Sequence, residues 1–100
     1  MELEWDEVKR ESNLAKHGLD FAVAFELFAD YFMEWLDTSQ DYGEDRWVAL
    51  GMIRGVVVVL VYTERNGKLR LISFRKGSVR ERRVYDDARQ KRLGPCESND

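Results

Sequence analysis

Most of the basic side chains lie in the last third of the sequence, where they could bind an anion. Residues 65–92 contain eleven Lys and Arg against three Asp and Glu, a balance of +8, whereas residues 1–64 have a balance of −9. Most of these cations are arginines, whose planar guanidinium groups bind phosphate through paired hydrogen bonds. The basic block predicts a surface for a polyanion or an acidic partner. The alternative is an exposed helix face with ordinary ion pairs.

Groups that can transfer protons accompany these cations. Glu64-Arg65 follows a long apolar run, Arg75-Lys76 follows the next one, and His17 is the only histidine, the side chain that titrates near neutral pH. RNA is cleaved by its own 2′-hydroxyl when a base, an acid and cations surround the phosphate, and this chemistry needs no metal. We expect such a site here. The structural alternatives are a hairpin-tip charge for Arg65 and a helix-terminal residue for His17.

The sequence argues against several other kinds of chemistry. With one histidine and one cysteine, Cys96, far apart, neither a metal cluster nor a disulfide is expected, and no cofactor is predicted. No nucleophile elbow or Gly-rich phosphate loop is present. The longest apolar run, residues 55–63, is about half of the roughly 20 residues that span a bilayer, so no membrane contact is expected. The acidic N-terminus is unlike a secretory signal, which predicts a cytoplasmic protein.

Two helices are predicted in the first third of the chain. Asp6 is a suitable N-cap for a helix that reaches His17, and Gly18 suits the left-handed conformation that ends a helix. Asp20 can cap a second helix over residues 21–28, and its nearly continuous apolar surface predicts that it is buried. The short apolar start at residues 3–5 leaves room for a strand before the first helix.

Four strands are predicted next, over residues 31–36, 46–53, 56–62 and 69–74. The third is β-branched and apolar on both faces, which is typical of the middle of a sheet with a helix layer beside it. Asn66-Gly67 predicts a hairpin between the last two strands. This hairpin places Arg65 near Lys68, and it leaves Arg75 and Lys76 at the opposite end of the sheet.

A third helix is predicted after the strands. Ser78 and Glu81 form a capping box that opens a helix over residues 79–92. Val84, Tyr85 and Ala88 are expected to face the sheet, and the arginines are expected to outline the exposed side. The whole order predicts one α+β domain with two N-terminal helices, a four-stranded antiparallel sheet and a C-terminal helix, over residues 1–93. Residues 94–100 are expected to form a flexible tail.

Several blocks of the sequence resemble the BrnT toxin family and follow one another in that family's order. In the first half they are WDEVK at 5–9, NLAKHG at 13–18, DF at 20–21 and EDRWVALG at 44–51. In the second half they are VYTER at 61–65, RLISFRK at 70–76 and RERRVY at 80–85. The resemblance spans about residues 3–86, and several motifs in order are more specific than any one alone.

The resemblance implies a RelE-like ribonuclease toxin of a type II toxin–antitoxin system, which blocks translation by cleaving RNA. It also implies neutralisation by a ribbon-helix-helix antitoxin, a heterotetramer of the two proteins, and contact with operator DNA only through the antitoxin. Carried over by motif, the catalytic candidates are His17, Glu64, Arg65, Arg75 and Lys76, and the RNA-binding candidates are Lys16, Arg46, Arg80 and Arg83. No metal ligand is implied. The alternative function is a non-catalytic interaction module or co-repressor with a basic partner-binding surface.

Overall fold

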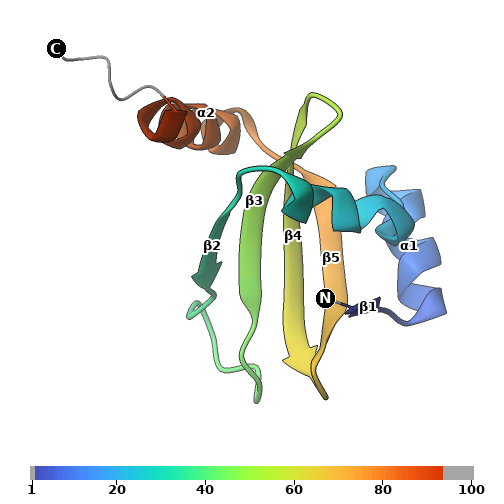
Figure 1. Cartoon of the computed structure of the whole chain (residues 1–100). Coiled ribbons are helices and arrows are strands. Elements are labelled where there is room, and N and C mark those ends of the chain that lie inside the picture. Colours follow the sequence, from blue (N-terminus) through green and yellow to red (C-terminus); the bar gives the residue numbers. More distant parts are fainter. Residues whose placement is uncertain (1, 94–100) are drawn as a thin grey trace, which may run out of the picture.

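The computed structural model describes residues 2–93, and these form a sheet with helices on both sides (Figure 1). The elements in chain order are β1 (Glu2–Glu4), α1 (Glu7–His17), the 3-10 helix η1 (Phe21–Ala29), β2 (Met33–Leu36), β3 (Trp47–Ile53), β4 (Val56–Arg65), β5 (Lys68–Lys76) and α2 (Val79–Leu93). The predicted tail over residues 94–100, with Cys96, lies outside the described residues. No helix in the described part is both long and apolar enough to cross a membrane.

The sheet has five strands in the order β1-β5-β4-β3-β2. Strands β2 to β5 form the predicted antiparallel meander, but β1 lies parallel to β5 at its free edge, with Glu2 opposite Lys68 and Glu4 opposite Arg70. The predicted four-stranded antiparallel sheet is therefore wrong in this detail, because the sheet is mixed and has one more strand. A three-residue strand with two glutamates has almost no sequence pattern typical of a strand. It is a strand because its backbone pairs with β5.

Turn and cap residues form the ends of the elements as their chemistry predicts. The Asp6 carboxylate accepts the Val8 N–H at 2.8 Å, and Gly18, at φ +73°, donates its N–H to the Leu14 carbonyl. Asn66 and Gly67 both have positive φ, the conformation of a tight hairpin turn. The second predicted helix is present after its Asp20 cap, but it is a 3-10 helix.

One face of the sheet packs against η1, whereas α1 lies beside the β5 edge (Figure 1). Its buried side chains are Phe21, Ala24 and Leu27 from η1, and Ala49, Ile53, Val58, Leu60, Tyr62, Leu71 and Phe74 from the strands. The helix η1 lies very close to β3, since a Cβ on Gly51 would stand 2.7 Å from Leu27 Cγ. Only glycine at position 51 permits this approach. This layer is the main hydrophobic core.

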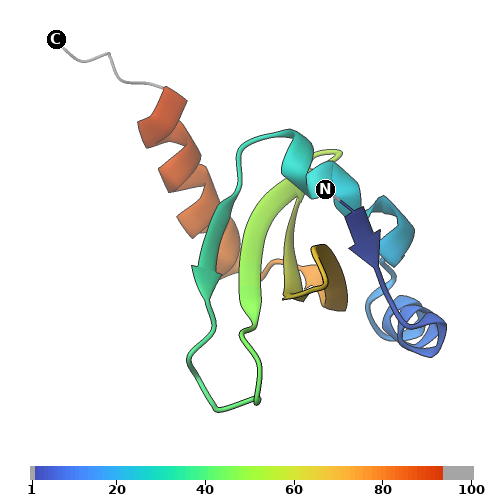
Figure 2. The same ribbon diagram turned by 60° about the horizontal axis from the view of Figure 1, so that its bottom comes forward.

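The opposite face of the sheet is covered by α2 at one end only (Figure 2). Tyr85 is fully buried there against Leu50, Val57 and Val59, and its hydroxyl donates to the Tyr31 carbonyl at 2.9 Å. The expectation that Val84 also faces the sheet is wrong, because its side chain is 45% exposed. With one fully buried anchor, α2 presents most of its surface to solvent.

Candidate functional site: a basic join between β5 and α2

The join between β5 and α2 gathers several of the predicted site residues. Arg75 and Lys76 end the strand, and Arg80 lies in the first turn of the helix. Between them, the Gly77 N–H donates to the Val57 carbonyl at 2.8 Å, which holds the turn against β4. A Cβ on Gly77 would come within 3.1 Å of Val57 Cγ1, so the tight approach favours glycine. We call this region the β5–α2 join.

Arg75 is held rigidly by Glu81 at this join. Its two terminal nitrogens each lie 2.8 Å from a Glu81 carboxylate oxygen, and one also donates to the Lys76 carbonyl. Glu81 accepts the Ser78 N–H, and the Ser78 hydroxyl accepts the Glu81 N–H, as the predicted capping box requires. These contacts, led by the Arg75 hydrogen bonds, lower the pKa of Glu81 to about 2. Glu81 therefore stays ionised, and it orients a guanidinium that is only partly exposed.

Three further cations of this region lack such a partner, and they face different directions. Lys76 alternates with Arg75 and so lies on the opposite face of the sheet, whereas Arg83 lies on the side of α2 away from the buried Tyr85. Lys76, Arg80 and Arg83 are exposed, and none forms an ion pair with another residue in the 2–93 range. Together with Arg75 and Glu81 they give the join a net charge of +3. Positive charge free to bind is thus concentrated where β5 passes into α2.

The hairpin end of β4 holds a different group of predicted residues. Arg65 lies 3.2 Å from the Glu44 carboxylate, which also stands 3.7 Å from Arg46 Nε. The Arg46 guanidinium lies 4.0 Å from the centre of the Tyr42 ring. A cavity of about 470 Å³ opens here, lined by Glu44, Asp45, Trp47, Thr63, Glu64, Asn66 and Gly67. Its three carboxylates against two neighbouring guanidiniums make this end less suited to a phosphate than the β5–α2 join.

The two groups are well separated along the sheet, as the hairpin predicts. Arg75 lies opposite Val59, six residues before Arg65 on β4, which at the usual rise per strand residue is about 20 Å. One scissile phosphate cannot reach both Arg65 and Arg75. The predicted catalytic set therefore does not form a single cluster.

His17 and Lys16 occupy the last turn of α1, on the side of the molecule nearer the β5–α2 join. Asn13, one turn earlier, bonds to the Phe74 backbone, and Leu19, two residues later, lines a cavity with Lys76. His17 is half-buried and Lys16 is exposed. Of the proton-transfer candidates, His17 thus lies at the same end of the sheet as the join, but on the side of Phe74 and Lys76 and not on the side of Arg75. Glu64 lies at the hairpin end.

An irregularity in β5 places two cations, Lys68 and Arg70, on one face of the sheet with Arg65 and Arg75. The sequence did not identify Lys68 and Arg70 as site residues. The β4–β5 register shifts between Val61 and Tyr62, so Ile72 is an extra residue in β5. Without it, Arg70 and Arg75 would lie on opposite faces. With it, both lie on the face that carries Arg65 and Lys68, since their β4 partners alternate regularly. No residue type in this run announces a bulge, so the sequence offered no signal for the arrangement.

Each cation of this row has a carboxylate partner from elsewhere in the chain. Glu44 pairs with Arg65, Glu2 with Lys68, Glu4 with Arg70, and Glu81 with Arg75. The Lys68 and Arg70 partners come from β1, the strand absent from the predicted sheet. The four cations of this row are thus already paired with carboxylates. A polyanion can bind them only if it displaces those carboxylates.

A small α+β domain with an arginine-rich join beside a paired basic sheet face has a charge pattern that suits a polyanion. The model of a family described as "Ribonuclease toxin, BrnT, of type II toxin-antitoxin system" matches residues 5–81. The match covers more than three-quarters of the chain, which therefore belongs to the BrnT family of ribonuclease toxins. Among curated proteins, none matches this chain. Within the described residues, no group of three or more His, Cys, Asp or Glu side chains is placed to hold a metal ion.

Proposed function

We propose that this chain is a toxin that blocks translation in the cytoplasm by cleaving RNA without a metal ion, through attack of the RNA 2′-hydroxyl on the adjacent phosphate. The family match supports a ribonuclease and an antitoxin partner. The observation that carries the proposed chemistry is the β5–α2 join, where Arg75 is fixed by Glu81 and where Lys76, Arg80 and Arg83 are exposed on the adjoining ends of β5 and α2.

At the join, Arg75 stabilises the negative charge that develops on the scissile phosphate, and Lys76 assists it. Arg80 and Arg83 on α2 bind neighbouring phosphates. His17 accepts the 2′-hydroxyl proton as the oxygen attacks phosphorus, and it returns that proton to the 5′-oxygen as the P–O5′ bond breaks. Glu81 takes no part in this transfer, because its low pKa and its bond to Arg75 keep it ionised at neutral pH. In this scheme Glu64, Arg65 and Arg46 lie outside the reacting centre. Of these, Arg65 and Arg46 bind RNA on either side of it together with Lys16, whereas the Glu64 carboxylate makes no phosphate contact.

The antitoxin is a ribbon-helix-helix protein that covers the basic face in a heterotetramer and brings operator DNA to the complex. Opposite charge speeds the association of the two proteins. Co-expression with the small protein of the neighbouring reading frame should rescue growth and give a complex that elutes as one species in size-exclusion chromatography. Separate elution at micromolar concentration and low salt would contradict this part of the proposal.

The test of the chemistry is cleavage of a defined RNA by the purified chain in the presence and absence of EDTA, followed by analysis of the fragment ends. We expect EDTA to leave the rate unchanged and the products to carry 2′,3′-cyclic phosphates. Fragments with 3′-hydroxyl ends, or activity that disappears with the chelator, would overturn the mechanism.

A matched pair of variants tests where the centre lies. Arg75→Ala should lower kcat by about 10²–10³, by analogy with removal of one donor to a developing anion. Arg65→Ala, which removes the same group at the hairpin end, should raise KM and leave kcat within a few-fold of the wild type. The reverse pattern would move the centre to the hairpin end.

His17→Ala should lower kcat by about 10²–10⁴ if the imidazole transfers a proton. Lys16→Gln, at the adjacent position, should change KM alone. If His17→Ala alters only stability, the proton-transfer assignment fails.

A further inference from the structure

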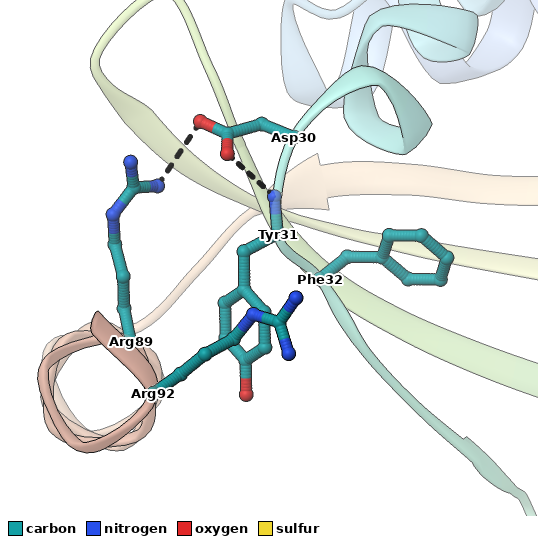
Figure 3. A pocket seen from close by; sticks show the side chains of 5 residues that line it. All are labelled: Asp30, Tyr31, Phe32, Arg89 and Arg92. Atoms are coloured by element: carbon teal, nitrogen blue, oxygen red, sulfur yellow. Dashed lines mark hydrogen bonds and ion pairs between the residues drawn. The ribbon is translucent and has the colours of Figure 1, made fainter. Parts of the chain in front are cut away.

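A pocket at the far end of α2 is lined in part by residues outside the region that matches the family. It has a volume of about 440 Å³ and is lined by Asp30, Tyr31, Phe32, Arg89 and Arg92 (Figure 3). Two of its walls come from α2, and the others come from the segment between η1 and β2. The α2 residues lie beyond the matched range 5–81. We call it the Arg89–Arg92 pocket.

The pocket is held in shape by a short network of hydrogen bonds. Asp30 accepts the Tyr31 N–H at 2.6 Å and Arg89 at 3.1 Å. Arg89 also donates to the hydroxyl of the buried Tyr85, at 3.0 Å, and that hydroxyl donates to the Tyr31 carbonyl. The hydrogen bonds from Tyr31 and Arg89 hold the pKa of Asp30 below its usual value. The walls are therefore positioned before any ligand arrives.

The charge and the surface of the pocket suit an anion attached to a flat group. Two guanidiniums against the Asp30 carboxylate leave a net charge of +1, and Arg92 forms no ion pair with another described residue. The Arg92 guanidinium stands 5.4 Å from the centre of the Tyr31 ring, so both present planar surfaces at the same opening (Figure 3). The negative end of the α2 dipole lies in the same turn. A bare anion therefore gains little here, and a ligand needs stacking as well.

The pocket also lies in line with the β5–α2 join. Glu81, Tyr85 and Arg89 are spaced by four residues and so share one side of α2. Eight residues of helix separate Glu81 from Arg89, which is about 12 Å along the axis. Because Tyr85 on this side is buried against the sheet, a strand with one phosphate at the join reaches the pocket along the exposed flank of α2 beside it.

We propose that the Arg89–Arg92 pocket binds one nucleotide of single-stranded RNA, with the phosphate on the two guanidiniums and the base stacked on Tyr31. This inference rests on the proposed function, because it supplies an RNA-binding subsite to the same ribonuclease. The pocket fixes which nucleotide stands at the join, and it therefore sets the position of the cut relative to a preferred base.

The experiment measures binding of a fluorescent 2′-O-methyl hexanucleotide, which cannot be cleaved by hydroxyl attack, and of the same strand with abasic sugars. The wild type should bind the strand with bases at least about fivefold more tightly, as expected for one stacked base. Tyr31→Leu should abolish that difference. Arg92→Gln should weaken binding and lower the slope of log Kd against log salt by about 0.7, the value for one single-strand phosphate contact.

Lys91→Gln is the matched control, since Lys91 is an exposed neighbour with the same charge and lies outside the pocket. Lys91→Gln should leave the affinity for the strand and the slope of log Kd against log salt unchanged. Equal effects of Lys91→Gln and Arg92→Gln would overturn the proposal, as would an Arg92→Gln variant that no longer binds the antitoxin but keeps its RNA affinity. If Tyr31→Leu does not fold, the Arg92→Gln result decides.

The outcome is separable from that of the proposed function. If the wild type binds the uncleavable strand through the pocket but does not cleave ordinary RNA, the ribonuclease mechanism fails and the pocket stands. If ordinary RNA is cleaved and Arg92→Gln changes neither KM nor the cut position, the pocket fails alone.

Discussion

At the scale of single residues, Arg75 and Glu81 depend on each other. The carboxylate closes the N-terminus of α2 and fixes the guanidinium at once, so replacing either residue affects both the helix and the join. A drop in activity on mutation of Glu81 would therefore report misplacement of Arg75. Glu81 is a positioning residue. The free energy of unfolding should distinguish the effect of replacing Glu81 from that of replacing Arg75.

Glu81→Gln should lower the free energy of unfolding at pH 7 by about 1–2 kcal/mol, because it removes the charge of the carboxylate that pairs with Arg75, although the Gln amide oxygen can still accept the Ser78 N–H. The folded pKa of about 2 lies below the ordinary value of 4.5, so this stabilisation is present above pH 4.5 and is lost as pH falls toward 2. Urea unfolding at pH 7, 4 and 2.5 measures it. Asp87→Asn, an exposed change on the same helix, should show no comparable difference. If the wild type and Glu81→Gln differ as much in unfolding free energy at pH 2.5 as at pH 7, the assignment is contradicted.

At the scale of elements, two different devices protect the free edge of β5. Next to Lys68, Leu69 and Arg70 the edge is paired by β1. Farther along, the buried Asn13 amide of α1 takes the place of a strand, because it donates to the Phe74 carbonyl at 2.8 Å and accepts the Phe74 N–H at 3.0 Å. The edge thus has no unpaired backbone at Phe74, and α1 is fixed to the sheet.

Asn13→Ala should lower the free energy of unfolding by about 2–3 kcal/mol, because it leaves a buried N–H and C=O of β5 unpaired. Hydrogen exchange should show the weakened protection at Phe74 first. Ser12→Ala, at the exposed neighbouring position, is the control and should change stability by less than about 0.5 kcal/mol. A destabilisation by Asn13→Ala no larger than that of the control would remove the edge-pairing role.

The elements also show how far sequence reasoning reaches. Caps, the Asn66-Gly67 turn and the long strand at Val56 were predicted correctly, because each depends on local chemistry or periodicity. The parallel β1 and the bulge at Ile72 were not, because both depend on what lies opposite in space. The hairpin predicted that Arg65 and Arg75 are far apart. It did not predict that both side chains lie on the same face of the sheet. That these site residues act on RNA remains a prediction.

The β1 carboxylates should oppose RNA binding, since Glu2 and Glu4 pair with Lys68 and Arg70. The double variant Glu2→Gln/Glu4→Gln should bind the uncleavable oligonucleotide more tightly. Its salt slope should be steeper by up to about 1.4, which corresponds to two further phosphates bound on a single strand. Glu11→Gln, an exposed change on α1, controls for net charge. Unchanged affinity in the double variant would place Lys68 and Arg70 outside the RNA path.

At the scale of the whole molecule, the fold largely cancels the division of charge seen in the sequence. Glu2, Glu4, Asp30 and Glu44 from the acidic first part each pair with a cation of the basic block, at Lys68, Arg70, Arg89 and Arg65 respectively. The predicted basic surface is therefore confined to cations that keep no such partner within residues 2–93, chiefly on α2. RNA affinity should follow these few residues and should not follow the total charge of the block.

Reversal of charge at Arg80 and Arg83 should lower RNA affinity and flatten its dependence on salt, by about 0.7 in slope for each phosphate that the variant no longer binds. Both residues are exposed on α2, so the thermal stability of the fold should change little. Anisotropy titrations between about 50 and 200 mM salt measure the effect. Lys9→Glu, an exposed charge reversal on α1, is the control. An unchanged slope in the Arg80 and Arg83 variant would mean that the α2 arginines are only solvated.

The pairing of β1 with β5 also bears on the order in which the protein is made. Glu4 and Arg70 are 66 residues apart in the chain, so β1 leaves the ribosome well before β5 and has no partner until the intervening sequence has followed it. The β4–β5 hairpin can form from neighbouring residues, whereas β1 must close the longest loop in the fold. Until it does, Lys68 and Arg70 lack their carboxylates, and the nascent chain presents its most basic sheet face beside ribosomal RNA.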